Sequence, residues 1–218
     1  MITDDTRIQI ENITKGIILK GNHDHCTTIR NLLCGRFSTS TTVKEKFESN
    51  AIIKKEQAQF IEQFSKEHGL WIHELPPAGK YLTHGGEARV YYNEGDLSVI
   101  KLNEAVYYAT WLEFFNSILL HNLFFENTSY HLLGMAKEDE KLLAVLKQPF
   151  ITSDSQAELE DIKKFLLFNG FEHTKRQDYI HPELGLILED MHDEKVIVNS
   201  ETLFFIDTVF YTVAPVNG

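Results

Sequence analysis

Two strand–turn–strand patterns on either side of an apolar helix limit most strongly the folds open to this chain. The segments ARVYY (88–92) and LSVIKL (97–102) are rich in β-forming residues and are joined by the turn sequence NEGD. Residues 105–122 are strongly apolar and predict a largely buried helix, and residues 130–151 contain a second apparent hairpin around KEDE. The predicted order from here to the end of the chain is strand, strand, helix, strand, strand, then a helix and further strands.

The segment before this pattern predicts mixed short elements followed by a helix. RIQI (7–10) and GIILKG (16–21) have the composition of strands. Residues 42–69 carry apolar residues at helical spacing, with Thr42 as a cap and Gly69 at the end. A connector rich in Pro and Gly, ELPPAGKY, then gives the best internal boundary.

The segment after the pattern predicts one further helix and several short strands. Residues 153–170 have acids in the first turn, lysines later and a glycine at the end, and Ser153 or Ser155 is the predicted cap. The strands are expected in LGLILED, VIVN and TLFFID.

Charge and cysteine content exclude several classes of function. The net charge is −11, and an acidic surface repels the phosphate backbone, so we expect no nucleic-acid partner. No apolar run reaches the roughly 18–20 residues that span a bilayer. The N-terminal sequence is acidic and polar, which is not typical of a secretory signal. With only Cys26 and Cys34, a cytoplasmic protein with reduced thiols is predicted, and NHDHC (22–26) followed by Cys34 fits no strong zinc pattern.

Three ionisable residues stand out because apolar strands position them. Asp190 and Asp207 each follow an apolar run, although a solvated acid at a strand end is also common. Lys101 shares one face of its strand with Val99 and needs an anionic partner there. Glu113 on the following helix is the best partner, and Glu104 is the second choice, being too close to Lys101 in sequence.

Six segments follow one another between about Tyr81 and Tyr211: GGEARVYY, SVIKL, WLEFFNSILLHN, LKQPFI, DMHDEKVIVN and FID. In this order they resemble the motifs of the protein-kinase-like superfamily, closest to the small kinase domain of polyvalent proteins from bacterial mobile elements, best populated in Bacteroidetes. The resemblance assigns them, in the same order, to the phosphate loop, the lysine strand, the regulatory helix, the hinge, the catalytic loop and the metal motif.

This resemblance implies an α+β, kinase-like fold of two lobes. Residues 1–75 are then an extension packed on the N-lobe, residues 76–148 the N-lobe with an antiparallel sheet and a helix, and residues 149–218 a reduced C-lobe. Only 11 residues follow Asp207, so we expect a small-molecule acceptor, or a partner chain that completes the short lobe.

The resemblance also implies an ATP- and Mg²⁺-dependent phosphotransferase whose acceptor is unknown. The implied site residues are, for the nucleotide, Gly85, Gly86, Lys101, Glu113, Gln148 and Phe150; for catalysis, Asp190, His192 and Lys195; and for the metal, Asp207 and Asn199. The hinge backbone is expected to pair with an adenine edge, but Pro149 has no N–H, so only its neighbours supply donors.

Lys195 departs from the family pattern, which has Asn at this position as a metal ligand. An ammonium group has three donors and no acceptor, so it cannot bind Mg²⁺. Three alternatives remain open: Lys195 partly replaces the metal charge, Asn199 supplies the oxygen, or catalysis is weak or absent. In the last case the protein is a pseudokinase, a module that binds a nucleotide or a partner without turnover.

Overall fold

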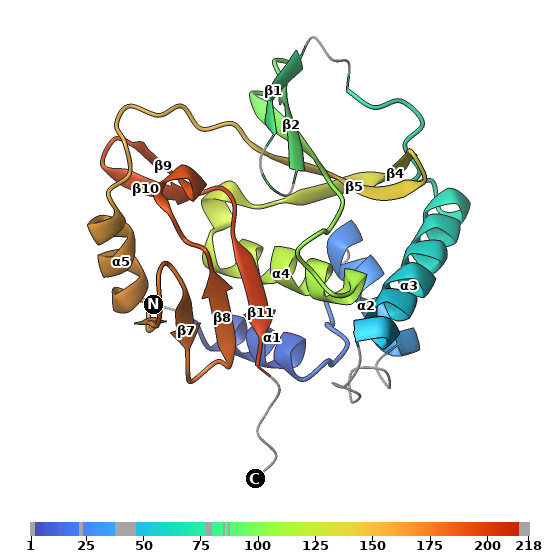
Figure 1. Ribbon diagram of the computed structural model, residues 1–218, viewed down its shortest axis with the longest axis horizontal. Coiled ribbons are helices and arrows are strands. Elements are labelled where there is room, and N and C mark those ends of the chain that lie inside the picture. Colours follow the sequence, from blue (N-terminus) through green and yellow to red (C-terminus); the bar gives the residue numbers. More distant parts are fainter. Residues whose placement is uncertain are drawn as a thin grey trace. The chain divides into compact units, whose positions relative to one another are not determined.

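The computed structural model describes residues 3–21, 24–37, 47–76, 80–84, 86 and 88–213. These residues form a mixed α+β structure with antiparallel sheets, as predicted. The elements, shown in Figure 1, are α1 (Asp4–Thr14), α2 (His25–Phe37), α3 (Phe47–Glu67), β1 (Tyr81–His84), β2 (Ala88–Asn93), β3 (Ser98–Asn103), α4 (Trp111–Phe124), η3 (Glu126–Thr128), β4 (His131–Glu138), β5 (Lys141–Pro149), α5 (Leu159–Phe168), β6 (Glu172–His173), β7 (Tyr179–His181), β8 (Leu186–Glu189), η4 (Asp193–Lys195), β9 (Val196–Asn199), β10 (Thr202–Phe205) and β11 (Val209–Thr212).

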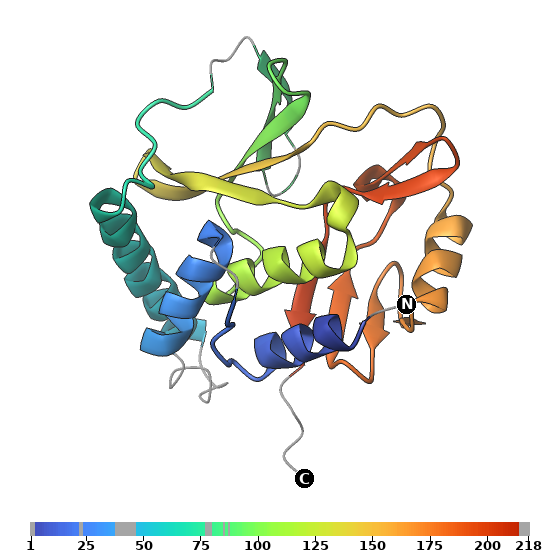
Figure 2. The ribbon, with the colours of Figure 1, turned by 180° about the vertical axis from the view of Figure 1, so that it is seen from behind.

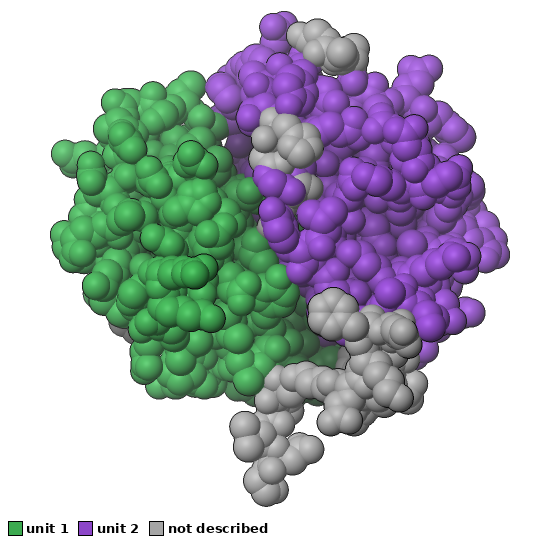
Figure 3. Space-filling view, in the orientation of Figure 1, with its two compact units in different colours: residues 1–20, 116–129, 151–218 green, residues 21–115, 130–150 purple. Residues whose placement is uncertain are grey.

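The chain divides into two compact units, which Figure 3 colours separately. Unit 1 comprises residues 1–20, 116–129 and 151–218, and unit 2 comprises residues 21–115 and 130–150. Helix α4 contributes its first turn to unit 2 and the rest to unit 1. The predicted division into an extension and two lobes stays a prediction.

Unit 2 is built on a five-stranded antiparallel sheet in the order β1-β2-β3-β5-β4. Both predicted hairpins are confirmed, because β2 pairs with β3 and β4 pairs with β5. One face of the sheet carries a core of Tyr91, Leu102, Ala136, Leu143 and Val145, with Ile72 and Leu75 packed on it. The burial of these apolar side chains gives the main stabilisation of the sheet.

The edge of the sheet at β4 is covered by the chain that follows α3. The Ile72 N–H donates to the Met135 carbonyl at 2.8 Å, and the Met135 N–H donates to the Leu70 carbonyl at 2.8 Å. Gly134 makes this approach possible, because a Cβ at Gly134 would overlap the Leu70 carbonyl oxygen. Helices α2 and α3 also contact β4, and Figure 2 shows them beside it.

Helix α3 also holds the start of α4. The Lys54 ammonium donates to the carbonyls of Ala105 and Tyr108 at 2.6 and 2.8 Å. The Leu112 N–H donates to the Gln57 side-chain oxygen at 3.0 Å. The first amides of a helix have no partner within it, so Gln57 satisfies one of these donors from another element.

Unit 1 contains a four-stranded sheet in the order β11-β8-β7-β6 and the separate hairpin β9–β10. Its core is a phenylalanine cluster, with the rings of Phe125 and Phe205 stacked at 4.3 Å and those of Phe124 and Phe210 at 5.4 Å. Stacked phenylalanines therefore pack β10 and β11 against the end of α4.

Several predicted elements before the first sheet are wrong. RIQI lies in α1, where Thr3 caps the helix by accepting from the Thr6 N–H at 3.2 Å, and residues 16–21 form no strand. The helix expected over 42–69 is α3, and its predicted cap Thr42 lies outside the described residues. Gly69 follows this helix with φ 72°, as expected of a residue that ends it.

Two predicted helices begin later than expected. Helix α4 starts at Trp111 rather than at 105, because Ala105 has φ 54° and its N–H donates to the Asn103 side chain. Helix α5 starts after Glu158 instead of at a serine cap, because Ser155 bridges to Val198 in an extended conformation. Helix α2 and strands β1, β6, β7 and β11 were not predicted.

Among the described residues, no helix has the length and apolar character needed to cross a membrane.

Candidate functional site

Asp190 and Asp207 lie at the same end of one pair of strands. Strand β8 pairs with β11 in antiparallel register, with Glu189 opposite Val209. Asp190 directly follows β8, and Asp207 precedes β11 by one residue, Thr208. Residues opposite each other in such a pair have Cα atoms about 5 Å apart. The register therefore brings the segments of Asp190 and Asp207 together within unit 1.

The Asp190 carboxylate faces two basic side chains of its own loop. Its Oδ2 lies 3.3 Å from Lys195 Nζ and 3.6 Å from His192 Nε2. The Asp190 side chain is 65% exposed, whereas the Lys195 side chain is only 12% exposed. The structure thus places the three predicted catalytic residues in contact. The Lys195 ammonium, which stands where the family pattern has Asn, offsets the negative charge of Asp190, the candidate base.

The backbone of this loop is fixed by contacts that the sequence did not reveal. Asp190 has φ 56°, a left-handed conformation that is uncommon for residues other than Gly, Asn and Asp. Its N–H donates to Asp178 Oδ1 at 3.0 Å, and the Met191 N–H donates to the Gln177 carbonyl at 2.9 Å. Burial raises the pKa of Glu189, and the nearby Asp178 carboxylate raises it further.

Asp207 is held by strand pairing and by helix α4. Phe205 pairs with Val196, and the Ile206 N–H donates to the Lys195 carbonyl at 3.0 Å, which ties this segment to the catalytic loop. The next residue, Thr208, is bonded through its hydroxyl to His121 Nδ1 at 2.8 Å.

His121 is a buried histidine with satisfied partners, as predicted. Its side chain is fully buried, and its Nε2 lies 2.9 Å from the Thr128 carbonyl oxygen. Its contact with Thr208 was not foreseen, because hydrophobic spacing does not show which side chains of distant segments meet.

Asn199 lies at the far end of the β9–β10 hairpin from Asp207. It pairs with Thr202 beside a turn whose residues Ser200 and Glu201 have φ 49° and 61°. Its amide donates to the Thr152 carbonyl at 2.9 Å. Val196 and Phe205 pair at the other end of the hairpin, and Asp207 follows shortly after Phe205. Because a strand rises about 3.3 Å per residue, the two ends of the hairpin are roughly 10 Å apart. The register does not bring the two predicted metal ligands together.

Lys101 lies in the interior of the sheet of unit 2. It pairs with Val90 on one side and Leu146 on the other, and only 7% of the residue is exposed. Its ammonium donates to the Tyr130 hydroxyl at 3.3 Å and lies 5.2 Å from the centre of the Tyr130 ring. The Tyr130 ring therefore lies within the distance of a cation–π contact with the ammonium.

The two predicted carboxylate partners of Lys101 have contacts of their own. Glu113 lies in the first turn of α4, and its Oε2 accepts from the Ala109 N–H at 3.0 Å. Glu104 pairs with Lys141 at 2.9 Å. The pairing of Lys101 with Glu113 stays a prediction.

The predicted phosphate loop is described at one of its two glycines. Gly85 lies outside the described residues. Gly86 faces the hydroxyl of Tyr107, which occupies the space that a Cβ at Gly86 would need. Tyr107 precedes α4, is 52% exposed and was not singled out in the sequence.

The predicted hinge residues lie at the end of β5. Gln148 is buried and pairs with Val99, Pro149 pairs with Ser98, and Phe150 follows the strand with 36% of its surface exposed. Val99, Lys101 and Gln148 therefore share one face of the sheet, because paired and alternate residues point the same way.

A groove of about 530 Å³ lies next to the predicted catalytic loop within unit 1. Its walls are residues 153–157 on one side and Asp193, Glu194, Val196 and Ile197 on the other. The Gln156 amide donates to the Asp193 carboxylate at 3.1 Å and joins the two walls. The groove has three carboxylates, counting Asp154, so it is unfavourable for an anionic molecule.

Among the described residues, no group of three or more His, Cys, Asp and Glu side chains forms a metal site. His23 of the weak zinc pattern lies outside the described residues, and His25 begins α2. Cys26 and Cys34 are both buried in α2, and burial raises the pKa of the Cys26 thiol.

Comparison with known families identifies the chain. A profile of the family described as the serine/threonine/tyrosine kinase found in polyvalent proteins matches residues 54–214, about three quarters of the chain. The match begins within α3, earlier than the first kinase motif in the sequence at Tyr81. Comparisons with curated proteins and with solved structures give no match. The family is described as a kinase, which supports kinase-like phosphotransfer in general terms. The chain therefore belongs to the family of serine/threonine/tyrosine kinases found in polyvalent proteins.

Proposed function

We propose that the protein transfers the terminal phosphate of ATP to a hydroxyl group, with Mg²⁺ as cofactor. The observation that carries this proposal is the β8–β11 register, which brings the segments of Asp190 and Asp207 to one end of a strand pair. Family membership supplies the reaction class. In this proposal, unit 2 supplies the kinase-like N-lobe and unit 1 the reduced C-lobe.

The proposed reaction uses Asp190 as the base or orienting group. The acceptor oxygen attacks the γ-phosphorus, the bond to the β–γ bridging oxygen breaks, and ADP leaves. The acceptor proton passes to the Asp190 carboxylate, which His192 helps to hold in place. Lys195 lies beside the same carboxylate and supplies a positive charge that offsets the charge of the transferred phosphate.

Among the described residues, the proposed donor set supplies one carboxylate for a magnesium ion. Mg²⁺ binds through one or two carboxylates together with phosphate oxygens, and half-buried Asp207 offers one carboxylate. Lys195 cannot be a ligand, and Asn199 donates to Thr152 at the other end of its hairpin. When bound, the ion would neutralise charge on the phosphates.

The nucleotide is proposed to bind to unit 2 through Gly85, Gly86, Lys101, Glu113, Gln148 and Phe150. The acceptor is proposed to enter the groove beside the catalytic loop. Because three carboxylates line that groove, a neutral or cationic acceptor suits it better than an anionic one.

A thermal-shift measurement with ATP, with and without Mg²⁺, tests metal-dependent binding. A ligand of the folded state raises the melting temperature, so the parent protein should show a larger shift when Mg²⁺ is present. Asp207→Asn should lose the Mg²⁺-dependent part of the shift. Asp161→Asn, which changes an exposed acid of α5, is the matched control and should keep it. An equal shift for Asp207→Asn and the parent would exclude Asp207 as a metal ligand.

The second candidate function is a pseudokinase, and the contact between Lys195 and Asp190 favours it. An assay of ADP release separates the two functions. Lys195→Asn should lower turnover if the ammonium assists transfer. The same variant should raise turnover from a negligible value if the lysine has replaced a needed ligand, in which case the parent protein binds nucleotide without turnover.

A further inference from the structure

The segment between β3 and α4 presents one side chain to the predicted phosphate loop. The hydroxyl of Tyr107 occupies the space that a Cβ at Gly86 would need, and the ring carbon that carries this hydroxyl would lie 3.3 Å from such a Cβ. The hydroxyl is therefore within van der Waals reach of the Gly86 Cα. A larger residue at this point of the loop has room only if the tyrosine ring moves.

A closed turn holds Tyr107 in this place. The Tyr108 N–H donates to the Ala105 carbonyl at 3.2 Å, so Val106 and Tyr107 are the two central residues of a β-turn. Ala105 and Tyr108, at the two ends of the turn, are 0% and 3% exposed, whereas the two central residues are each 52% exposed. The ends of the turn are thus buried, and its exposed tip carries the ring that meets Gly86.

Helix α3 holds both ends of this turn through one side chain. The Lys54 ammonium donates to the Ala105 carbonyl and to the Tyr108 carbonyl. Hydrogen bonds from a charged donor are stronger than those between neutral groups. Lys54 is half-buried, and an ammonium removed from water needs such partners. The position of Tyr107 is therefore tied to α3, which precedes the kinase motifs in the sequence.

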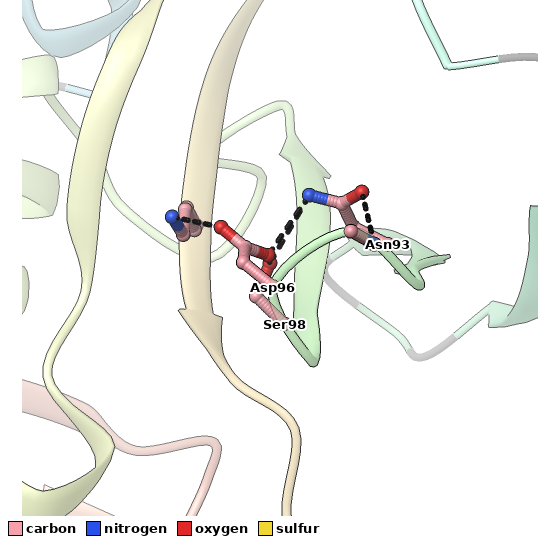
Figure 4. A network of polar contacts seen from close by, with 5 residues as sticks. Asn93, Asp96 and Ser98 are labelled. Atoms are coloured by element: carbon pink, nitrogen blue, oxygen red, sulfur yellow. Dashed lines mark hydrogen bonds and ion pairs between the residues drawn. The ribbon is translucent and has the colours of Figure 1, made fainter.

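The other end of strand β2 has a turn that its own side chains fix, as Figure 4 shows. Asp96 forms an ion pair with Lys147 of β5 and accepts from the Ser98 hydroxyl at 2.5 Å. The Asn93 amide donates to the same carboxylate at 3.0 Å. At the end of β2 that follows the phosphate loop, the contact with Gly86 comes instead from the segment between β3 and α4.

A fixed side chain against a glycine loop reduces the cost of ordering that loop. Glycine loses more conformational freedom on ordering than any other residue. A ligand that must order such a loop binds more weakly, because part of the interaction free energy offsets the lost backbone entropy. A ring that already restricts the loop lowers this loss. Tyrosine suits the task, since its rigid ring has only two side-chain torsions.

We propose, on the basis of the function proposed above, that Tyr107 is a positioning residue for the nucleotide phosphates. Its ring packs on Gly86 and keeps the loop in the conformation in which backbone N–H groups bind the phosphates. Lys54 acts through Tyr107, because it holds the turn from which the ring extends. Helix α3 thereby contributes to nucleotide affinity without contacting the nucleotide.

Isothermal titration of the full chain with ATP and Mg²⁺ tests this inference. Tyr107→Ala should weaken binding by about five- to thirtyfold, the effect of leaving one residue of backbone for the ligand to order. Tyr107→Phe keeps the ring and should weaken binding by less than about threefold, below the effect of a typical net hydrogen bond. Val106→Ala changes the other exposed residue of the turn and should leave the dissociation constant unchanged. Tyr107→Leu, which also lacks the ring, serves if the alanine variant does not fold by circular dichroism.

A double-variant cycle tests the contact itself. Gly86→Ala places a methyl group where the Tyr107 hydroxyl lies, so it should displace the ring and weaken ATP binding by about fivefold or more. In the Tyr107→Ala background this space is empty, and the same change should have little further effect. Equal effects of Gly86→Ala in the two backgrounds would overturn the contact.

The link to α3 is tested by Lys54→Met. This change removes both hydrogen bonds to the turn and should weaken ATP binding by about threefold or more in the parent. It should have little effect in the Tyr107→Ala background, because the lysine acts through the ring. Lys55→Met changes an exposed neighbour on the same helix and is the matched control. Full additivity of Lys54→Met and Tyr107→Ala would overturn the link.

The results distinguish failure of the inference from failure of the proposed function. If the parent binds ATP and Tyr107→Ala binds it equally well or more tightly, the inference is overturned and the function stands. If Tyr107→Phe weakens binding as much as Tyr107→Ala, packing of the ring is overturned as the cause. Absence of ATP binding by the parent would overturn both the inference and the function.

Discussion

Lys101 and Asp190 differ in how the chain holds them. Lys101 lies within a central strand, is 7% exposed and has its ammonium on Tyr130. Asp190 lies in a loop, its side chain is 65% exposed, and its carboxylate contacts two side chains of that loop. The first group is part of the packed interior, so its removal affects stability and function together. The second can be changed with little effect on the fold.

The largest effect is expected from Asp190→Asn, which should lower turnover by at least about a hundredfold because an amide cannot accept the proton. Asn tolerates the left-handed conformation that Asp190 adopts, so the free energy of unfolding should change by less than about 0.5 kcal/mol. Steady-state kinetics and urea unfolding measure the two quantities. Asp161→Asn, which changes an exposed acid of α5, is the control. A destabilisation above about 2 kcal/mol by Asp190→Asn would contradict the contrast with Lys101.

Gly134→Ala should destabilise the sheet that carries Lys101 by about 2–4 kcal/mol, because the new methyl group displaces the Leu70 carbonyl. Urea unfolding measures this change. Gly95→Ala is the matched control, since its Cβ would meet only Asn93 Oδ1 at an ordinary 3.6 Å. Equal stability of the two variants would show that the chain after α3 does not hold the edge of the sheet.

Lys101→Met should cost about 1 kcal/mol of stability, because Met keeps the apolar stem and loses the hydrogen bond to Tyr130. Tyr130→Phe removes the same bond from the other side. If the contact is real, the two changes should not add in the double variant. If the two changes in the free energy of unfolding add fully in urea, Lys101 and Tyr130 do not interact. If Lys101→Met binds ATP as well as the parent protein, the lysine has no role in binding.

The smallest effect concerns pH and lies in unit 1. Burial lowers the pKa of His181, and its Nδ1 has no hydrogen-bond partner among the described residues. Between this lowered pKa and the ordinary value near 6.5, the unfolded chain binds more protons than the folded chain, so stability rises with pH in that window. His181→Gln should reduce this rise in thermal melts from pH 5 to 7. An unchanged slope would mean that the histidine titrates normally.

The sequence predicted best those elements whose pattern is local. The hairpins around NEGD and KEDE, the strands before Asp190 and Asp207, and the buried His121 follow from alternation, turn residues and apolar surroundings. Helix α1 was missed because its Thr3 cap was overlooked and β-branched residues at 8 and 10 favoured a strand.

Contacts between distant segments could not be predicted from the sequence. Nothing in the sequence shows that Tyr130 meets Lys101, that Thr208 meets His121 or that Leu97 accepts from Phe150. Each depends on packing and register that form only when the chain folds. The identities of the candidate site residues were therefore predictable, while their partners were not.

The segment that bonds to β4 has a further consequence for solubility. A β-strand with unpaired N–H and C=O groups is a template on which other chains can assemble. The backbone around Leu70 and Ile72 occupies that template at Met135. A protein shortened to residues 76–218 would expose it, together with the apolar face that Ile72 and Leu75 cover. The part of the chain that precedes the kinase motifs therefore also protects the protein against aggregation.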